Sequence, residues 1–212
     1  MSSEKFKAYL QETIETYNKS AKQMSKTHSD LNFWQPEFEK FASLLPGKEV
    51  IDIGCGWGRD AQLFIKSGYN YLGIDLSQKM IEQAKRLTPN AQFLKMNMYS
   101  LDLPNHHFDG IWAVASLLHI PKKNLEEALK EIRRIVKPGG IGFFTMKEGE
   151  GEKMVFRSKS KDGLFFAYCQ LNEFSDALTN TGFDVLEKSK GEKKLNDLGD
   201  SSTRLLYFAR AK

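Results

Sequence analysis

Val50-Ile51-Asp52-Ile53-Gly54-Cys55-Gly56-Trp57-Gly58-Arg59-Asp60 is the stretch of this 212-residue chain that predicts its fold. An apolar run with one carboxylate leads into three glycines at alternate positions, and an amphipathic segment follows at once. This order is typical of a buried strand, a tight turn and a helix start, which bring backbone close to a nucleotide-like ligand. Glycine suits the turn because it tolerates positive φ and has no Cβ to keep a ligand away. A plain strand-to-helix turn, with glycines for tightness alone, is the alternative.

The spacing of these glycines bears on the kind of nucleotide. A dinucleotide site has the pattern G-x-G-x-x-G, whereas here the third glycine, Gly58, comes one residue early. The Gly-Lys-Ser/Thr ending of a P-loop is absent. Asp60 stands where the helix begins, and a carboxylate there repels a phosphate. The pattern therefore favours a ligand without phosphates, and an ammonium or sulfonium group would suit Asp60.

A second carboxylate supports an adenosine ligand. The segment 69–75 has the pattern of a second strand and ends in Asp75, about 20 residues after Gly54, where Rossmann-like sites bind ribose hydroxyls. A carboxylate can accept hydrogen bonds from both vicinal hydroxyls. The alternative places Asp75 beside the N-cap of the next helix, with Ser77 as the better cap, and both interpretations can hold together.

With these motifs the chain resembles a class I (Rossmann-like) S-adenosylmethionine-dependent methyltransferase, of the small bacterial group similar to ubiquinone and menaquinone biosynthesis enzymes. The resemblance runs from about Glu49 to Met146. It rests on five ordered segments: Val50–Asp60, Gly73–Ser77 with Met80, Phe93–Met98, Phe108–His119 and Val136–Gly140. It implies S-adenosylmethionine as cofactor, with S-adenosylhomocysteine as product, and leaves the methyl acceptor open.

The resemblance also implies which residues bind the cofactor. Asn97 stands where an aspartate is commoner, near the adenine amino group, and the Met98 N–H would reach a ring nitrogen. The segment Ala113–Ser116 would lie at the methionine end, and Trp57 and Arg59 either line the site or face solvent. The predicted cofactor-binding residues are Asp52, Gly54, Cys55, Gly56, Gly58, Arg59, Asp60, Asp75, Leu76, Met80, Asn97, Met98, Ala113 and Ala115.

Hydrophobic periodicity predicts an α/β fold with alternating strands and helices, hence a parallel sheet covered on both faces. Strands are expected at 49–53, 70–75, 91–95, 108–114, 141–146, 183–188 and 203–210, and helices at 6–24, 36–45, 58–67, 77–87, 122–136 and 172–180. Gly139-Gly140 is expected to stop the helix at 122–136. The resemblance implies a seven-stranded, mainly parallel sheet whose last strand is antiparallel.

Composition fits a single domain over 1–212, with neither a linker nor a repeat. We expect a helical cap at 1–45, a cofactor-binding core at 46–146, an insert at 147–170 and the rest of the sheet at 171–212. The apolar runs are too short to span a membrane, and no signal-peptide pattern opens the chain. Two cysteines form neither a disulfide framework nor a metal-ligand pattern, so a cytoplasmic protein without a metal is expected. The net charge of +4 is too small to argue for nucleic acid.

The candidate catalytic residue is His119, just past the fourth strand on the cofactor side. A histidine titrates near neutrality and could serve as a general base or orient an acceptor, although a helix-capping or loop role is the alternative. Substrate selection is expected from the N-terminal helices and the insert, closing as a lid, with Tyr17, Trp34, Arg157 and Tyr168 as candidate contacts. The alternative is a β-hairpin that simply packs on the sheet edge.

We therefore expect methyl transfer to a small-molecule O, N, S or C nucleophile. The alternatives are a tRNA or rRNA methyltransferase and a protein that binds the cofactor without catalysis. The chain has Ala115-Ser116-Leu117-Leu118 where the resemblance to amino-methylating nucleic-acid enzymes would require Asn/Asp-Pro-Pro-aromatic, so a nucleic-acid partner is not expected. A monomer and a homodimer both remain open.

Overall fold

The computed structural model describes residues 3–27, 33–156, 162–191 and 203–212, and the account below concerns these residues. Their centre is a seven-stranded sheet in the order β3-β2-β1-β4-β5-β9-β8. The strands are β1 Glu49–Ile53, β2 Asn70–Asp75, β3 Gln92–Lys95, β4 Phe108–Ala113, β5 Val136–Lys147, β8 Phe183–Lys190 and β9 Arg204–Ala211. Strands β1 to β5 pair in parallel, while β9 runs antiparallel to both β5 and β8. The predicted mainly parallel sheet with an antiparallel last strand is confirmed.

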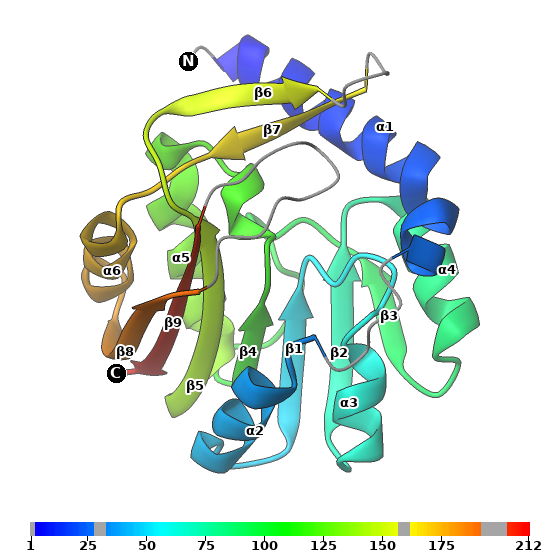
Figure 1. Cartoon of the computed structure of the whole chain (residues 1–212). Coiled ribbons are helices and arrows are strands. Elements are labelled where there is room, and N and C mark those ends of the chain that lie inside the picture. Colours follow the sequence, from blue (N-terminus) through cyan, green and yellow to red (C-terminus); the bar gives the residue numbers. More distant parts are fainter. Residues whose placement is uncertain (1–2, 28–32, 157–161, 192–202) are drawn as a thin grey trace.

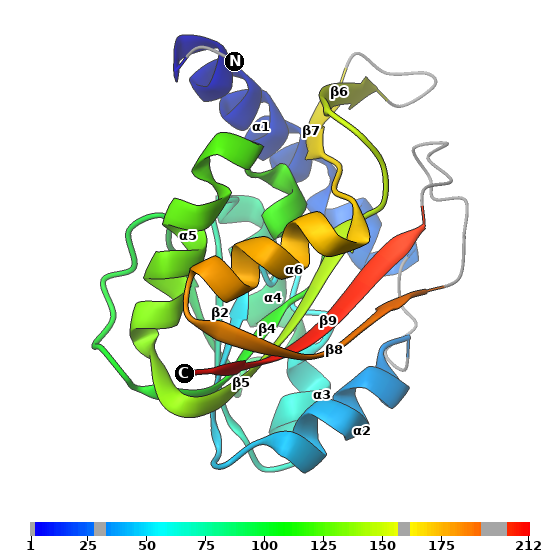
Figure 2. The same ribbon diagram turned by 90° about the vertical axis from the view of Figure 1, so that its left-hand side faces the viewer.

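Helices cover both faces of the sheet (Figures 1 and 2). They are α2 Gln35–Leu44, α3 Ala61–Lys66, α4 Gln78–Leu87, α5 Lys122–Ile135 and α6 Leu171–Asn180, with a short 3-10 helix, η1, at Leu117–His119. On one face Phe41 of α2 and Phe64 of α3 pack around Trp112 of β4. On the other face α5 and α6 bury a second, mainly aliphatic core. The two cores fix the sheet, so the loops at the carboxyl ends of its strands are held on a rigid support.

The long helix α1, Ser3–Thr27, lies across the carboxyl ends of the parallel strands (Figure 1). Beside it runs a hairpin of β6, Glu152–Phe156, and β7, Gly163–Ala167, which forms a separate two-stranded sheet. The free edge of β7 is bonded to α1: Thr13 Oγ1 accepts from the Phe165 N–H at 3.1 Å, and Thr16 Oγ1 donates to the Gly163 carbonyl at 2.9 Å. Of the two N-terminal helices, α1 therefore lies over the sheet edge with the hairpin, whereas α2 packs on the face of the sheet.

The junction between α5 and β5 differs from the sequence prediction. The helix ends at Ile135 and the strand begins at once with Val136, which pairs with Phe108. Gly139 and Gly140 lie inside the strand, at a shift of its register with β4, and do not stop the helix. Pro138 has no N–H to continue a helix, and Gly139 takes a φ of +83°. Helix α3 also starts later than predicted, because residues 54–60 are occupied by the glycine turn.

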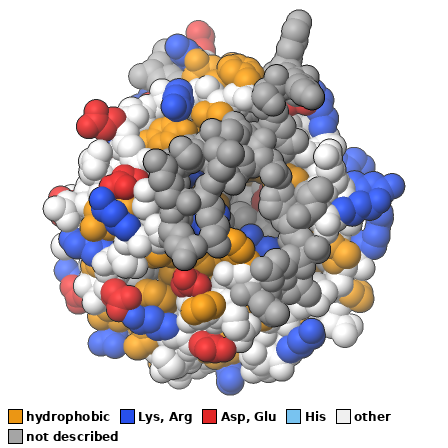
Figure 3. Space-filling model, viewed as in Figure 1, with side chains coloured by type: hydrophobic (Ala, Val, Ile, Leu, Met, Phe, Trp, Pro, Cys, Tyr) orange, Lys and Arg blue, Asp and Glu red, His pale blue; other side chains and the backbone are white. Residues whose placement is uncertain are grey.

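None of the described helices is long and apolar enough to cross a lipid bilayer. On the face seen in Figure 3, acidic and basic side chains are interspersed between apolar and neutral ones.

Candidate functional site

The glycine turn joins β1 to α3 and begins the site. The N–H groups of Gly54 and Cys55 both donate to the Ile74 carbonyl of β2, at 2.8 and 2.9 Å, which ties the turn to the neighbouring strand. All three glycines have positive φ. A Cβ on Gly54 would lie 2.3 Å from the Ser116 Cβ, whereas a Cβ on Gly56 would meet nothing within 4 Å. Gly54 thus allows close packing, and Gly56 leaves open space beside the backbone.

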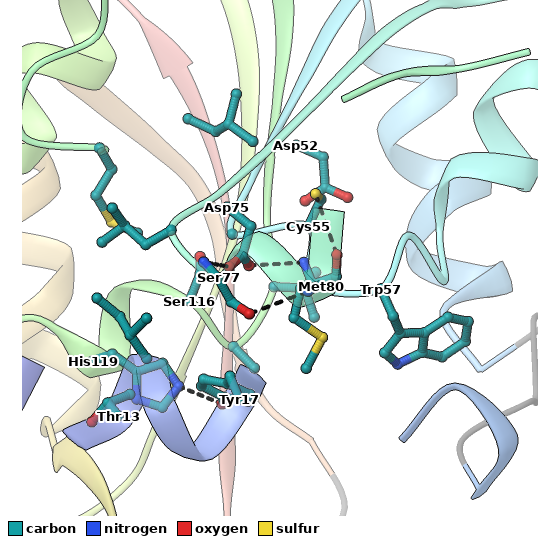
Figure 4. A pocket seen from close by; sticks show the side chains of 18 of the residues that line it. Thr13, Tyr17, Asp52, Cys55, Trp57, Asp75, Ser77, Met80, Ser116 and His119 are labelled. Atoms are coloured by element: carbon teal, nitrogen blue, oxygen red, sulfur yellow. Dashed lines mark hydrogen bonds between the residues drawn. The ribbon is translucent and has the colours of Figure 1, made fainter. Parts of the chain in front are cut away.

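Asp75, at the end of β2, faces the turn. Its Oδ2 accepts from the Gly56 N–H at 3.0 Å and its Oδ1 from the Ser77 N–H at 2.7 Å (Figure 4). Burial raises the pKa of Asp75 to about 6, while these backbone bonds oppose the rise. A carboxylate accepts about four hydrogen bonds in all, so this one keeps acceptor capacity for a ligand.

Helix α1 is held on the start of α4 by Asn18. Ser77 caps α4 by accepting from the Met80 N–H at 3.2 Å, and its hydroxyl donates to Asn18 Oδ1 at 2.7 Å. The same Asn18 oxygen accepts from the Lys79 N–H at 3.1 Å. The sequence predicted the Ser77 cap but gave no sign of Asn18.

A pocket with a cavity of about 200 Å³ lies between the turn, α1 and the loop after β4. Most of the predicted cofactor residues line it: Asp52, Gly54, Cys55, Gly56, Arg59, Asp60, Asp75, Leu76, Met80, Met98 and Ala115. Tyr17 and His119 line it as well, as does Trp57. Val114 and Ser116, from the segment predicted to lie at the methionine end, line it too. The other lining residues were not predicted: Leu10, Thr13, Ile14, Met24, Ile74, Ser77, Met96, Tyr99 and Ile120.

The lining from α1 has a recognisable origin in sequence, since its residues recur at helical spacing along one face. Two other lining side chains carry buried hydroxyls without a hydrogen-bond partner in the described part of the chain, Tyr99 and Ser116. A buried hydroxyl without a partner costs stability, so these two groups are candidates to bind a ligand.

Asp60 already has partners on both carboxylate oxygens. Arg59 bonds it through Nε at 2.6 Å and Nη2 at 2.7 Å, and the Trp112 indole N–H donates to Oδ2 at 2.9 Å. The cation that the sequence suggested for Asp60 is therefore supplied by Arg59. Asp52 accepts from the Tyr71 hydroxyl at 2.7 Å, and burial, together with nearby Asp60, holds the pKa of Asp52 well above its usual value.

His119 uses both ring nitrogens. Nδ1 lies 2.7 Å from the Phe165 carbonyl of β7, so Nδ1 carries the proton and donates it. Nε2 then accepts from the Tyr17 hydroxyl at 2.8 Å (Figure 4). Burial lowers the pKa of His119 to about 4, so the imidazole is neutral at pH 7. Tyr17 and His119, from α1 and η1, form one hydrogen-bonded pair at the pocket.

The remaining predicted residues lie outside the pocket lining. Among the cofactor candidates, Gly58 packs against Ala84 of α4, the Asn97 side chain accepts from the Tyr99 N–H, and Ala113 is fully buried in the core. Among the substrate candidates, Trp34 is buried against Phe143, Tyr168 is buried beside Phe166 and Gly149, and Arg157 lies outside the described residues. In the described part of the chain no cluster of three or more His, Cys, Asp or Glu side chains could hold a metal ion.

Comparison with known proteins explains this geometry. Residues 50–140, which include the glycine turn and Asp75, match the family model of a methyltransferase domain. Residues 50–140 are therefore a methyltransferase domain. The predicted family, whose members use S-adenosylmethionine, is thereby confirmed.

Two curated relatives illustrate the match. The chain is 38% identical over 103 residues to 2-methyl-6-phytyl-1,4-hydroquinone methyltransferase of Synechocystis sp., over 47% of this chain and 32% of that protein. It is 25% identical over 173 residues to sterol 24-C-methyltransferase of Pneumocystis carinii, over 74% of this chain and 45% of that protein. The chain thus spans less than half the length of either relative.

Solved structures share the fold. A S-adenosylmethionine-dependent methyltransferase of Methanosarcina mazei superposes with a TM-score of 0.74 at 18% identity, covering 81% of this chain and 96% of that one. Another from Clostridium acetobutylicum gives 0.69 at 17% identity, covering 92% and 98%. At these identities the likeness concerns the fold of the methyltransferase domain.

Proposed function

We propose that the protein transfers a methyl group from S-adenosylmethionine to a small-molecule acceptor. The observation that carries the proposal is the position of Asp75, which is bonded to the Gly56 N–H and lines a mostly apolar pocket inside a methyltransferase domain. The alternatives, an RNA methyltransferase and a cofactor-binding protein without catalysis, are outcomes of the test below.

The residues of the pocket fit this cofactor. Gly56 leaves room for a ligand against the backbone, and Asp75 offers acceptors for two ribose hydroxyls. The unpartnered Ser116 hydroxyl lies at the end of β4, the predicted position of the methionine part. Arg59 is committed to Asp60, which leaves the turn without a free cation for a pyrophosphate.

When bound, the cofactor supplies a methyl group on a sulfonium, which is already activated for transfer. The protein must then position the acceptor, exclude water and remove a proton where the acceptor bears one. Helix α1 contributes to water exclusion, since Ile14 and Met24 line the pocket from the side opposite the sheet. We infer that α1 and the hairpin act together as the predicted lid. The Phe165 N–H of the hairpin donates to Thr13 of α1, and the Phe165 carbonyl accepts from His119.

Tyr17 and His119 are placed to accept a proton as a pair. The Tyr17 hydroxyl donates to His119 Nε2, so the tyrosine oxygen keeps lone pairs for an acceptor O–H or N–H. As the acceptor gives its proton to the Tyr17 oxygen, the tyrosine proton passes to Nε2, while the Phe165 carbonyl holds the Nδ1 proton. The catalytic role predicted for His119 therefore becomes one exercised through Tyr17.

A small molecule is the favoured acceptor because α1 lies over the sheet edge and helps to enclose the pocket. The two curated relatives carry names that specify a hydroquinone and a sterol as acceptors, both small and largely apolar. Two buried free thiols, Cys55 and Cys169, support the cytoplasmic location that the composition suggested.

The test uses methyl-labelled S-adenosylmethionine with fractionated cell extract. We expect label in the small-molecule fraction, and Tyr17→Phe should lower the rate about a hundredfold or more while cofactor affinity stays unchanged. Tyr69→Phe, a buried tyrosine outside the pocket lining, is the matched control. Label in RNA would support the first alternative, and tight cofactor binding without transfer into any fraction would support the second.

A further inference from the structure

The edge of β7 that faces away from β6 is bonded to two other segments of the chain. Every second residue of an antiparallel strand turns its N–H and C=O away from the partner strand, and Gly163 and Phe165 form bonds outside the hairpin in this way. The Gly163 carbonyl accepts from Thr16 of α1 at 2.9 Å, and the Phe165 N–H donates to Thr13 of α1 at 3.1 Å. The Phe165 carbonyl accepts from His119 of η1 at 2.7 Å. Phe165 is therefore bonded to both α1 and η1.

These bonds form a closed chain that includes the Tyr17–His119 pair. Thr13 lies one helical turn before Tyr17 on α1, so both side chains lie on the same face of the helix. From Thr13 the contacts run through Phe165 to His119. His119 Nε2 in turn accepts from the Tyr17 hydroxyl at 2.8 Å, which returns the chain to α1. Thr13, Tyr17 and His119 all line the pocket (Figure 4).

Ring contacts hold the plane of the His119 imidazole. It stacks on the Phe166 ring with centroids 5.2 Å apart and an interplanar angle of 28°, and the Tyr17 ring meets it edge-on at 5.4 Å. Stacking does not distinguish the two ring nitrogens from each other. Which nitrogen carries the proton is therefore set by the hydrogen bonds that the ring makes.

The position of that proton decides whether the pair can act as a base. With the proton on Nδ1, Nε2 is an acceptor and can take the Tyr17 proton while the tyrosine oxygen receives one from the methyl acceptor. With the proton on Nε2, the bond is reversed, and the imidazole donates to the Tyr17 oxygen. No acceptor nitrogen then faces Tyr17, so the pair cannot take up a further proton there.

We propose that Thr13 is a positioning residue that holds the Phe165 carbonyl against His119 and thereby keeps the imidazole proton on Nδ1. The Thr13 oxygen fixes the N–H of the same strand residue whose carbonyl accepts from His119. Thr13 is only 4% exposed, so without its hydroxyl the Phe165 N–H would lose its partner in a buried place, which favours a shift of the strand edge. This proposal rests on the proposed function, in which Tyr17 and His119 take up the proton of the methyl acceptor.

The experiment compares variants of two threonines on α1. Thr13→Val removes the hydroxyl and keeps the shape of the side chain, whereas Thr13→Ser keeps the hydroxyl. Thr16→Val is the matched control, because Thr16 is also buried and bonds the same strand edge at Gly163. The tautomer of His119 is read from the ring-nitrogen NMR shifts of protein with isotope-labelled histidine, and His119→Gln assigns its signals among the four histidines of the chain. The same proteins are assayed for transfer of labelled methyl from S-adenosylmethionine into the small-molecule fraction of a cell extract.

We expect the unchanged protein, Thr13→Ser and Thr16→Val to carry the His119 proton on Nδ1. In Thr13→Val the ratio of the two tautomers should shift about fivefold toward Nε2–H, the factor that one hydrogen bond contributes. Its kcat should fall with the fraction of the Nδ1–H form, while its Kd for S-adenosylmethionine stays unchanged.

Three results overturn the proposal: an unchanged protein with the proton on Nε2, a Thr13→Val variant with the proton still on Nδ1, or the same shift in Thr16→Val. The last of these would mean that any loosening of α1 from the hairpin has the effect. If Thr13→Val does not fold, Thr13→Ala removes the same hydroxyl and is judged by the same spectra. If the unchanged protein transfers no methyl group, the proposed function fails, and the tautomer comparison still decides the role of Thr13.

Discussion

The carboxyl group of Asp75 should make cofactor binding depend on pH between 7 and 5. Its pKa is raised to about 6, and its oxygens face the pocket while they accept from the Gly56 and Ser77 N–H groups. A proton on Asp75 competes with the ribose hydroxyls, which also need to donate to it. At pH 5 about nine-tenths of the free protein is protonated at this site, compared with about one-tenth at pH 7. If the bound form stays ionised, the Kd rises about tenfold over this range.

Replacing Asp75 with asparagine tests both the charge and the geometry. The amide can accept at one oxygen only, and its NH₂ group would face one of the two backbone N–H donors. Loss of hydrogen bonds to a charged group costs about 1.5–3 kcal/mol each, so the Kd for S-adenosylmethionine at pH 7 should rise roughly 10- to 150-fold. The variant has no proton to lose there, so its Kd should be nearly constant from pH 7 to 5. Calorimetric titration measures both effects, with the exposed Asp102→Asn as control.

A constant Kd for the unchanged protein across this range would refute the reasoning, because the free carboxyl could not then titrate near 6. The same slope in Asp75→Asn would refute it differently, by assigning the pH dependence to another group.

Three further predictions concern stability and the attachment of α1 to α4 through Asn18. Gly54→Ala should lower the unfolding free energy by about 2 kcal/mol or more, because both a steric clash and the positive φ oppose a side chain there. Gly56→Ala should lower it by only about 1–2 kcal/mol but should also weaken cofactor binding. Urea unfolding measures the first effect and calorimetric titration the second, and equal losses of stability in the two variants would contradict the geometry. Asn18→Ala should loosen α1 by about 1 kcal/mol, seen as faster amide exchange in α1 than in α5, and unchanged exchange would exclude the anchor. In the folded protein the pKa of His119 is lowered to about 4 from the usual 6.5, so the unfolded chain binds more protons between these two pH values. The contribution of the neutral His119 to stability is therefore lost as the pH falls from 6.5 to 4. Asp75, whose pKa is raised, changes the stability in the opposite direction over the same pH range, so the effect of His119 is isolated by comparison with His119→Gln. Between pH 7 and 5 the unfolding free energy of the unchanged protein should fall by about 1–2 kcal/mol more than that of the variant. Equal decreases in the two proteins would contradict the low pKa of His119.

The sequence predicted the sheet and the position of Asp75 beside the glycine turn because each part lies in one continuous segment. The residues 50–60 form strand, turn and helix start in a row, and Asp75 follows its own strand directly. In a parallel sheet the carboxyl ends of neighbouring strands meet at one edge, so two separate local patterns suffice to place Asp75 beside Gly56. The antiparallel β9 came from the resemblance, since the strand pattern of 203–210 has no direction in it.

The contacts around Asp60 and Asn97 could not be predicted from local patterns. Asp60 was expected to suit a cationic group of the ligand. Instead, the adjacent Arg59 forms an ion pair with it, and the Trp112 indole N–H of β4 donates a further hydrogen bond to it. A sequence does not show whether neighbouring opposite charges pair with each other or with a ligand. Asn97 uses its side-chain oxygen to accept from the Tyr99 N–H, a local turn bond that asparagine forms readily.

The part of the pocket that contains Tyr17 and His119 combines segments that meet only in the folded chain. This limits what any sequence pattern can predict there. Tyr17 and His119 are 102 positions apart and touch because Asn18 fixes α1 on α4 while η1 follows β4. The Phe165 carbonyl, from a third segment, sets which nitrogen of His119 carries the proton. A change in the hairpin can therefore alter the proton affinity of His119 without touching the pocket. Since β7 also bonds Thr13 of α1, movement of α1 away from the pocket must disturb the bonds of His119 as well. The proposed lid movement and the proposed proton transfer are thus coupled through one residue, His119.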